Sequence, residues 1–189
     1  MEANDMTNNP EKIINQTKLS ITQGDITQQA TDAIVNAANS NLRGGSGVDG
    51  AIHKAGGPAI LKECQQILSF QGRLFTGKAV ITTAGNMKAK HVIHTVGPIW
   101  QGGSKGEAEL LASAYQESLK LAAKKNLTSI AFPSISTGAY GYPVDEASKI
   151  AMKTVASFLS EASSIKEVIF VLFDANTFEA YSSTLQEIK

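Results

Sequence analysis

The sequence is short of cysteine and of long apolar runs, and each shortage excludes a class of protein. Cys64 is the only cysteine among 189 residues, which leaves no disulfide framework and no cysteine-based zinc site. No stretch approaches the roughly 18 apolar residues of a membrane span. The N-terminus is polar and has no apolar signal core. We therefore expect a cytoplasmic protein without a membrane partner, in which Cys64 is a small core residue.

An excess of charge of one sign is also missing, because 17 basic residues balance 17 acidic ones. This balance gives no reason to expect a nucleic acid as a partner. The length fits one domain, which buries roughly 70% of the surface that the unfolded chain exposes. We expect residues 1–17 to be a flexible N-terminal extension and residues 18–189 to form the domain.

Short β-branched runs alternate along the chain with longer segments of helical spacing. The predicted strands cover 18–22, 33–36, 79–83, 91–96, 129–132 and 167–173. Several strands are apolar throughout, which suits strands that are covered on both faces. Apolar spacing predicts helices over about 107–125, after Pro143 and near the C-terminus. The pattern predicts an α/β fold with a largely parallel sheet between two helical layers.

Three glycine-containing loops follow predicted strands. They are Gly24-Asp25, the loop over 44–50 and the loop over 134–143. Ligands of open α/β sheets bind beyond the carboxyl ends of the strands. If the sheet is parallel, the three loops meet at one edge and form a single site.

The loop Gly44-Gly45-Ser46-Gly47 is a candidate anion site. Glycines let a backbone approach a ligand closely, and a helix that begins there offers free N–H groups to a phosphate or pyrophosphate. No Gly-Lys-Ser/Thr ends this loop, so it is not a Walker A loop. It also differs from a dinucleotide-binding loop, because Asp49 and His53 follow at once on the helix. The alternative is a flexible loop that binds nothing.

Asp49 and His53 are four residues apart, so on a helix they share one face and can touch. A carboxylate and an imidazole can act as an acid–base pair, and an ionised Asp beside an anion site is placed to align or deprotonate a water. In the alternative interpretation, Asp49 only complements the helix dipole and His53 is half-buried. The spacing of His91 and His94 on a strand does not suggest a metal site.

The other candidate residues each have a structural alternative. Asn39 follows a strand and suits a pair of sugar hydroxyls, or forms a turn. Asp25 can accept from an exocyclic amine such as that of adenine, or cap a turn through Ile26-Thr27. The loop over 134–143 supplies hydroxyls and amides for a second wall over phosphates, with Tyr140 against a ribose, or merely leads into the next helix.

Four separated motifs, in this order, resemble the macro domain family of the MacroD type, to which bacterial O-acetyl-ADP-ribose deacetylases belong. The motifs are Asn36-Ala37-Ala38-Asn39, Gly47-Val48-Asp49-Gly50-Ala51-Ile52-His53, His94-Thr95-Val96-Gly97-Pro98 and Pro133-Ser134-Ile135-Ser136-Thr137-Gly138. The resemblance runs from about Lys18 to the C-terminus. It implies a three-layer α/β/α fold with a mixed sheet, and ADP-ribose as the core of the ligand.

The resemblance also implies a role for individual residues. Asp25 binds the adenine amine with Ile26 beside it, and Phe173 packs near adenine. Asn39 holds the distal ribose, Asp49 is the catalytic carboxylate, and His53 is its partner. The residues implied to clamp the diphosphate and distal ribose are Gly47, Val48, Ser136, Thr137, Gly138, Ala139 and Tyr140.

The implied activity is hydrolysis of ADP-ribose esters, without a metal or redox cofactor. Substrates are O-acetyl-ADP-ribose and mono-ADP-ribose attached to protein carboxylates, so mono-ADP-ribosylated proteins are expected partners. The alternative is a reader module that binds ADP-ribose without turning it over. Family members usually have glycine where Ser46 stands. Serine has less freedom at positive φ, so we expect an altered affinity or loop mobility.

Overall fold

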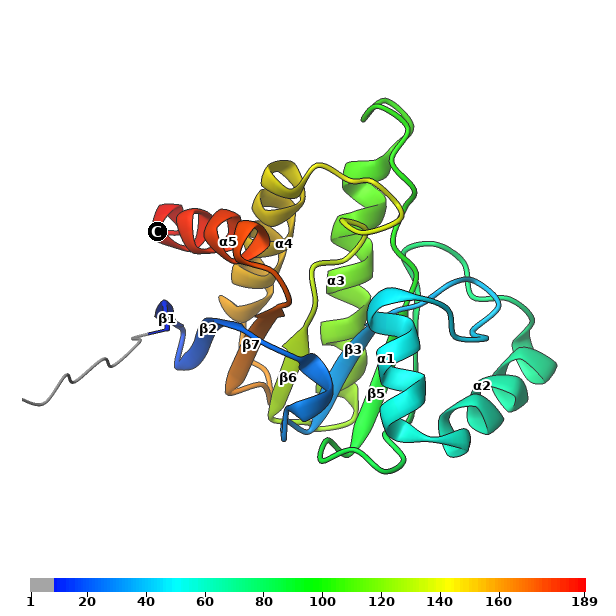
Figure 1. Cartoon of the computed structure of the whole chain (residues 1–189). Coiled ribbons are helices and arrows are strands. Elements are labelled where there is room, and N and C mark those ends of the chain that lie inside the picture. Colours follow the sequence, from blue (N-terminus) through cyan, green and yellow to red (C-terminus); the bar gives the residue numbers. More distant parts are fainter. Residues whose placement is uncertain (1–8) are drawn as a thin grey trace, which may run out of the picture.

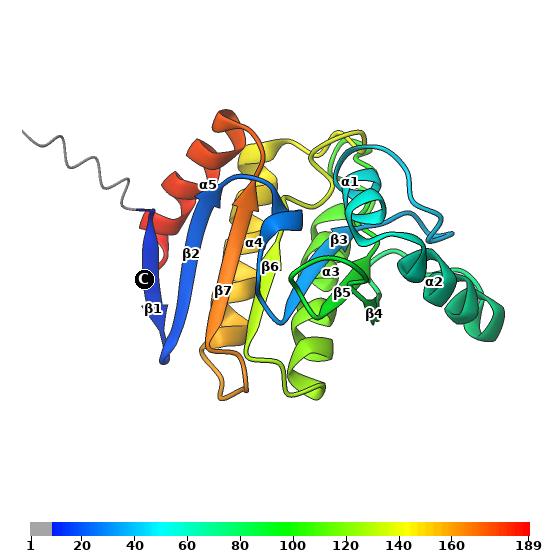
Figure 2. The ribbon, with the colours of Figure 1, turned by 60° about the horizontal axis from the view of Figure 1, so that its bottom comes forward.

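The centre of the fold is a seven-stranded mixed sheet. The computed structural model describes residues 9–189. The strands are β1 (Glu11–Ile14), β2 (Thr17–Gln23), β3 (Ala33–Ala37), β4 (Ala79–Thr83), β5 (His91–Thr95), β6 (Ser129–Phe132) and β7 (Glu167–Leu172). They lie side by side in the order β1-β2-β7-β6-β3-β5-β4 (Figure 2). The five inner strands are parallel, and both edge strands are antiparallel to their neighbours. This arrangement confirms the predicted mixed, largely parallel sheet.

Helices cover both faces of the sheet. The helices α1 (Gly47–Gly56) and α2 (Pro58–Gln71) lie on one face, and a short 3-10 helix, η1 (Ile26–Gln28), contacts α1. The opposite face carries α3 (Glu107–Lys124), α4 (Val144–Leu159) and α5 (Ala175–Glu187), which pack against one another in that order (Figure 1). The predicted three-layer α/β/α fold is therefore confirmed.

The sheet separates two hydrophobic cores, and this explains why several of its inner strands, such as β6, are largely apolar on both faces. Along β6, Ile130 and Phe132 pack into the core under α3, α4 and α5, whereas Ala131 packs into the core under α1 and α2. Successive side chains of a strand point to opposite faces. A strand with a core on each side therefore favours apolar residues at successive positions.

The N-terminal segment differs from the prediction. Glu11–Ile14 form the edge strand β1, which pairs with β2, and Ile14 packs against the core. The expectation of a flexible extension up to residue 17 is therefore wrong for this segment, while residues 1–8 lie outside the described residues. The run Glu-Lys-Ile-Ile is short and half charged, as edge strands often are, so its composition hides its pairing. None of the helices over residues 9–189 is long and apolar enough to traverse a bilayer.

Candidate functional site

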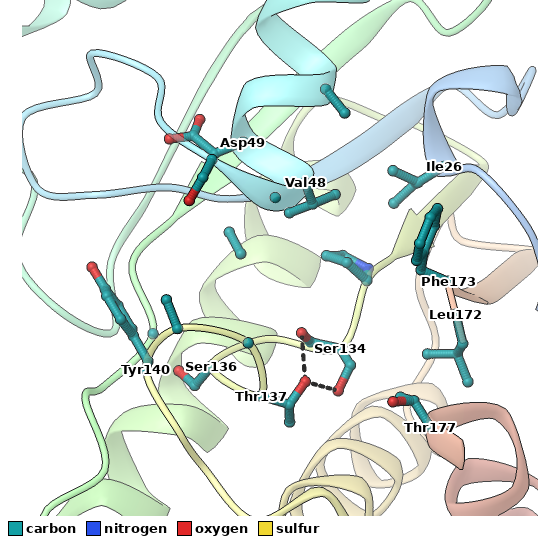
Figure 3. A pocket seen from close by; sticks show the side chains of 18 of the residues that line it. Ile26, Val48, Asp49, Ser134, Ser136, Thr137, Tyr140, Leu172, Phe173 and Thr177 are labelled. Carbon is teal, nitrogen blue, oxygen red and sulfur yellow. Dashed lines mark hydrogen bonds between the residues drawn. The ribbon is translucent and has the colours of Figure 1, made fainter. Parts of the chain in front are cut away.

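The three glycine-containing loops meet at the carboxyl ends of the parallel strands, as the sequence predicts. Together with the start of α5 they enclose a cavity of about 620 Å³. Every residue that the sequence analysis assigned to ligand contact lines this cavity, whereas His53 lies behind its wall. In Figure 3, Val48 and Asp49 form one side, with Ser134, Ser136 and Thr137 opposite.

The first wall is the N-terminus of α1 and the glycine loop before it. Gly47, the first residue of the helix, has a φ of +60°. Ser46 caps the helix with φ −98° and ψ 179°, which is extended backbone open to any residue. The expected strain at Ser46 is therefore absent, because positive φ falls on Gly44 and Gly47 instead. The serine hydroxyl makes no capping hydrogen bond and stands at the cavity wall.

Asp49 is a buried carboxylate in this wall, with 5% of its surface exposed. Its Oδ1 accepts a 2.8 Å hydrogen bond from Asn36 Nδ2 and lies 3.4 Å from His53 Nε2. The predicted proximity of Asp49 and His53 is confirmed, although the direct hydrogen bond comes from Asn36. Burial raises the pKa of Asp49, while the Asn36 hydrogen bond and the charge of His53 oppose this rise. A carboxylate with a raised pKa is a better proton acceptor than an exposed one.

Asn36 and His94 are residues of this site that sequence reasoning missed. Asn36 Nδ2 also lies 3.1 Å from His94 Nδ1, and both side chains are fully buried. The available signal was an asparagine inside an apolar strand, because a buried polar side chain needs a partner. Burial lowers the pKa of His94 to about 3, so its ring is neutral at physiological pH.

His53, Cys64 and His94 bring three possible metal-ligand atoms within 4.8 Å of one another. Hydrogen bonds already engage the ring of His94, at Nδ1 by Asn36 and at Nε2 by Thr82. Burial raises the pKa of Cys64 to about 11, which keeps the thiol protonated. As it stands, the cluster is a hydrogen-bonded group in the core rather than an open ligand set.

Asn39 and Asp25 line the cavity while also serving the structural roles considered as alternatives. Asn39 Nδ2 donates to the Gly44 carbonyl at 2.8 Å, and its Oδ1 accepts from Asn41 N at 3.2 Å. Asp25 Oδ1 caps η1 by accepting from Thr27 N at 2.9 Å and from Thr27 Oγ1 at 2.7 Å. Each side chain thus shapes a loop and presents polar atoms to the cavity.

The second wall is the loop from Pro133 to Tyr140. Ser136 adopts a φ of +67°, which is unusual for a residue with a side chain. It is 6% exposed, and its Oγ has no hydrogen-bond partner among the described residues. Gly97 permits this close packing, because a Cβ on it would overlap Ser136 Oγ. A strained residue with an unpartnered hydroxyl in a cavity wall is typical of a ligand site.

Two buried tyrosines support this second wall from below, and sequence reasoning also missed them. Tyr115 Oη accepts from Ile135 N at 3.1 Å, and Tyr181 Oη lies 3.0 Å from Ser134 Oγ. Thr137 Oγ1 donates to Ser134 Oγ at 2.8 Å (Figure 3). The Thr137 hydroxyl therefore also stabilises the loop.

Each end of the cavity carries an aromatic ring, half-buried at Tyr140 and exposed at Phe173. Tyr140 and Phe173 stand at opposite ends of the close-up in Figure 3. Phe173 is 85% exposed and shares its end with Ile26. An exposed ring beside an apolar side chain suits a flat, partly apolar group.

The protein thus combines an α/β fold with a cavity that suits an elongated ligand carrying phosphates at the middle of its length. The chain belongs to the macro domain family, whose model matches residues 35–151. It is 61% identical over 171 residues to a macro domain-containing protein of Caldanaerobacter subterraneus subsp. tengcongensis, covering 90% of this chain and 97% of the relative. It is 56% identical over 162 residues to the O-acetyl-ADP-ribose deacetylase of Klebsiella pneumoniae, covering 86% and 93%.

Solved structures agree with this assignment. The macrodomain of Oceanobacillus iheyensis, solved with ADP, superposes with a TM-score of 0.90 at 45% identity, covering 94% of this chain and 95% of that one. The Trypanosoma brucei macrodomain in complex with ADP-ribose has a TM-score of 0.80 at 36% identity, covering 87% and 68%.

Proposed function

We propose that this protein is an ADP-ribose-binding hydrolase that removes the acyl group of O-acetyl-ADP-ribose. The observation that carries the proposal is Asp49, a buried carboxylate in the cavity wall whose Oδ1 is fixed by Asn36. The high sequence identity to proteins named O-acetyl-ADP-ribose deacetylase supports the same activity. So does the resemblance to a macrodomain solved with ADP-ribose.

In this proposal ADP-ribose extends along the cavity. Adenine lies between Ile26 and Phe173, with Asp25 accepting from its amine. The diphosphate faces the N–H groups at the start of α1, whose dipole favours an anion. The loop that carries Ser136, Thr137 and Gly138 faces the diphosphate from the opposite wall.

The distal ribose and its ester then lie at the end of the cavity where Asp49 stands. Since Oδ1 of Asp49 accepts from Asn36, its Oδ2 is the oxygen that holds and deprotonates a water. The water oxygen adds to the ester carbonyl carbon, the bond between that carbon and the ribose oxygen breaks, and the proton taken up by Asp49 passes to the leaving ribose oxygen, which releases acetate and ADP-ribose. His53 and Asn39 keep the carboxylate and the ribose in place. Such positioning can contribute several kcal/mol to the lowering of a barrier.

The same chemistry extends to proteins. Mono-ADP-ribose on a glutamate or aspartate side chain is also an ester of the distal ribose, so the same water and carboxylate would cleave it. We propose mono-ADP-ribosylated carboxylates as a second substrate class. A panel of the acetyl ester and of ADP-ribosylated Glu, Ser and Arg targets would rank the substrates, and cleavage is expected for the esters alone.

Asp49→Ala tests the catalytic assignment. We expect the kcat for O-acetyl-ADP-ribose to fall by about 100-fold or more, the scale of losing a positioned general base. Calorimetry should show ADP-ribose binding that is retained within about tenfold, because most contacts remain. Equal hydrolysis by native protein and variant would disprove the role of Asp49. Tight binding without hydrolysis of any ester by the native protein would instead identify a reader module.

A further inference from the structure

A row of buried polar side chains crosses three neighbouring strands beneath α1 and α2. Asn36 on β3 is directly opposite His94 on β5, and Thr82 lies on the adjoining β4. Their exposed fractions are 0%, 0% and 2%. Buried polar groups in an apolar core cost stability unless each one has a partner. The row ends at Asp49, so its purpose is connected with the carboxylate.

The donor and the acceptor of each hydrogen bond in the row can be assigned by starting from Thr82, at the end of the row away from Asp49. Thr82 Oγ1 donates its only proton to the Thr83 carbonyl at 2.9 Å. It can therefore only accept from His94 Nε2, which lies 2.9 Å away. A neutral imidazole carries one N–H, so Nδ1 of His94 is an acceptor. Asn36 Nδ2, at 3.1 Å, donates to it.

This order of donors and acceptors fixes the orientation of the Asn36 side-chain amide. Its nitrogen faces both His94 Nδ1 and Asp49 Oδ1, at 3.1 Å and 2.8 Å, and an amide NH2 has a hydrogen for each. A flipped amide would place its oxygen against a carboxylate and a ring lone pair. In this orientation Oδ1 of Asn36 has no partner among the described residues, so the two contacts at Nδ2 determine the orientation of the amide.

We infer that Thr82 and His94 are positioning residues that act through Asn36 to hold the Asp49 carboxylate in its reactive orientation. This inference rests on the proposed role of Asp49 in hydrolysis. Without the Thr82 hydroxyl, the His94 proton can move to Nδ1, where it opposes the Asn36 amide. The amide then turns its oxygen toward Asp49 and displaces the carboxylate. The ligand-binding loops do not contain Thr82, so the turnover step should suffer rather than binding.

Two substitutions at Thr82 separate this role from simple packing. Thr82→Val keeps the shape and removes the hydroxyl, whereas Thr82→Ser keeps the hydroxyl and removes a buried methyl group. We expect Thr82→Val to lower kcat for O-acetyl-ADP-ribose by about tenfold or more, with KM and the Kd of ADP-ribose within about twofold. Thr82→Ser should restore kcat to within about twofold of native while lowering Tm through its small cavity. Equal kcat values for native protein and Thr82→Val would overturn the inference, and so would equal losses in both variants.

The tautomer of His94 gives a readout that needs no turnover. Ring-nitrogen NMR shifts of the native protein and of Thr82→Ser should show the proton on Nε2, and Thr82→Val should show a population with the proton on Nδ1. A native ring protonated at Nδ1 overturns the inference whatever the kinetics are. If the native protein hydrolyses no ester, the proposed function and the catalytic role of the row fail together, and the tautomer alone decides whether the hydrogen-bond order is right.

Discussion

At the scale of single residues, the glycines of the first wall are needed for different reasons. Gly47 is needed because its φ is positive, whereas Gly50 is needed because it has no side chain. A Cβ on Gly50 would overlap the carbonyl oxygen of Gly45 in the preceding loop. The sequence predicts a glycine loop here but cannot distinguish these two needs, because the second depends on how the helix packs against the loop.

Gly50→Ala should therefore displace the glycine loop and spoil the anion site. We expect the Kd of ADP-ribose to rise by about tenfold or more, since a shift of about 1 Å is costly in a positioned site. Titration calorimetry would measure it. Lys54→Ala, an exposed change on the same helix, is the control and should bind ADP-ribose like the native protein. An unchanged Kd in Gly50→Ala would show that the loop yields without loss.

At the scale of elements, the second wall depends on helices far away in the sequence. Ser134 Oγ forms a hydrogen bond with the hydroxyl of Tyr181 on α5, and Ile135 N donates one to the hydroxyl of Tyr115 on α3. Tyr181→Phe removes one of these supports, at about 1 kcal/mol for a typical hydrogen bond. We expect a modest loss of thermal stability and a several-fold weaker binding of ADP-ribose.

Tyr142→Phe is the matched control, because Tyr142 follows the same loop but packs through its ring, tilted by 52° against that of Trp100, rather than through its hydroxyl. Calorimetry and thermal melts on both variants would test the difference. If Tyr142→Phe weakened ADP-ribose binding as much as Tyr181→Phe, the hydrogen bond between the Tyr181 hydroxyl and Ser134 would not be what shapes the second wall.

The extent to which the elements could be predicted follows from how local their signals are. The inner strands were placed within one or two residues, because runs such as Val168-Ile169-Phe170 are apolar on both faces. The convergence of the loops followed from the parallel sheet. The sequence predicts a helix near the C-terminus, where Tyr181 lies, and a strand that contains His94, but it predicts no partner for either side chain. Their partners depend on strand register and helix packing, which no local pattern encodes.

At the scale of the whole molecule, the buried row joins the stability of the sheet to pH. His94 faces His53 of α1, Cys64 of α2, and the neutral partners Asn36 and Thr82, while Asp49 contacts Asn36 and His53. Burial, aided by the charge of His53, lowers its pKa from 6.5 to about 3 in the folded state. Between these values the unfolded chain binds a proton that the folded protein does not. Stability contributed by neutral His94 is therefore full above about pH 6.5 and declines as the pH falls toward 3.

The free energy of unfolding should thus decrease by about 1.5 kcal/mol through His94 alone between about pH 6.5 and about pH 5. Urea titrations at the two values would measure it in the native protein and in His94→Asn, whose amide oxygen can still accept from Asn36. The raised pKa of Asp49 acts in the opposite direction as the pH falls, but it is present in both proteins. The native protein should therefore lose about 1.5 kcal/mol more than the variant over this interval. Equal losses would mean that His94 accepts its proton inside the fold, and a charged His94 would compete with Asn36 for the acceptor atoms around Asp49.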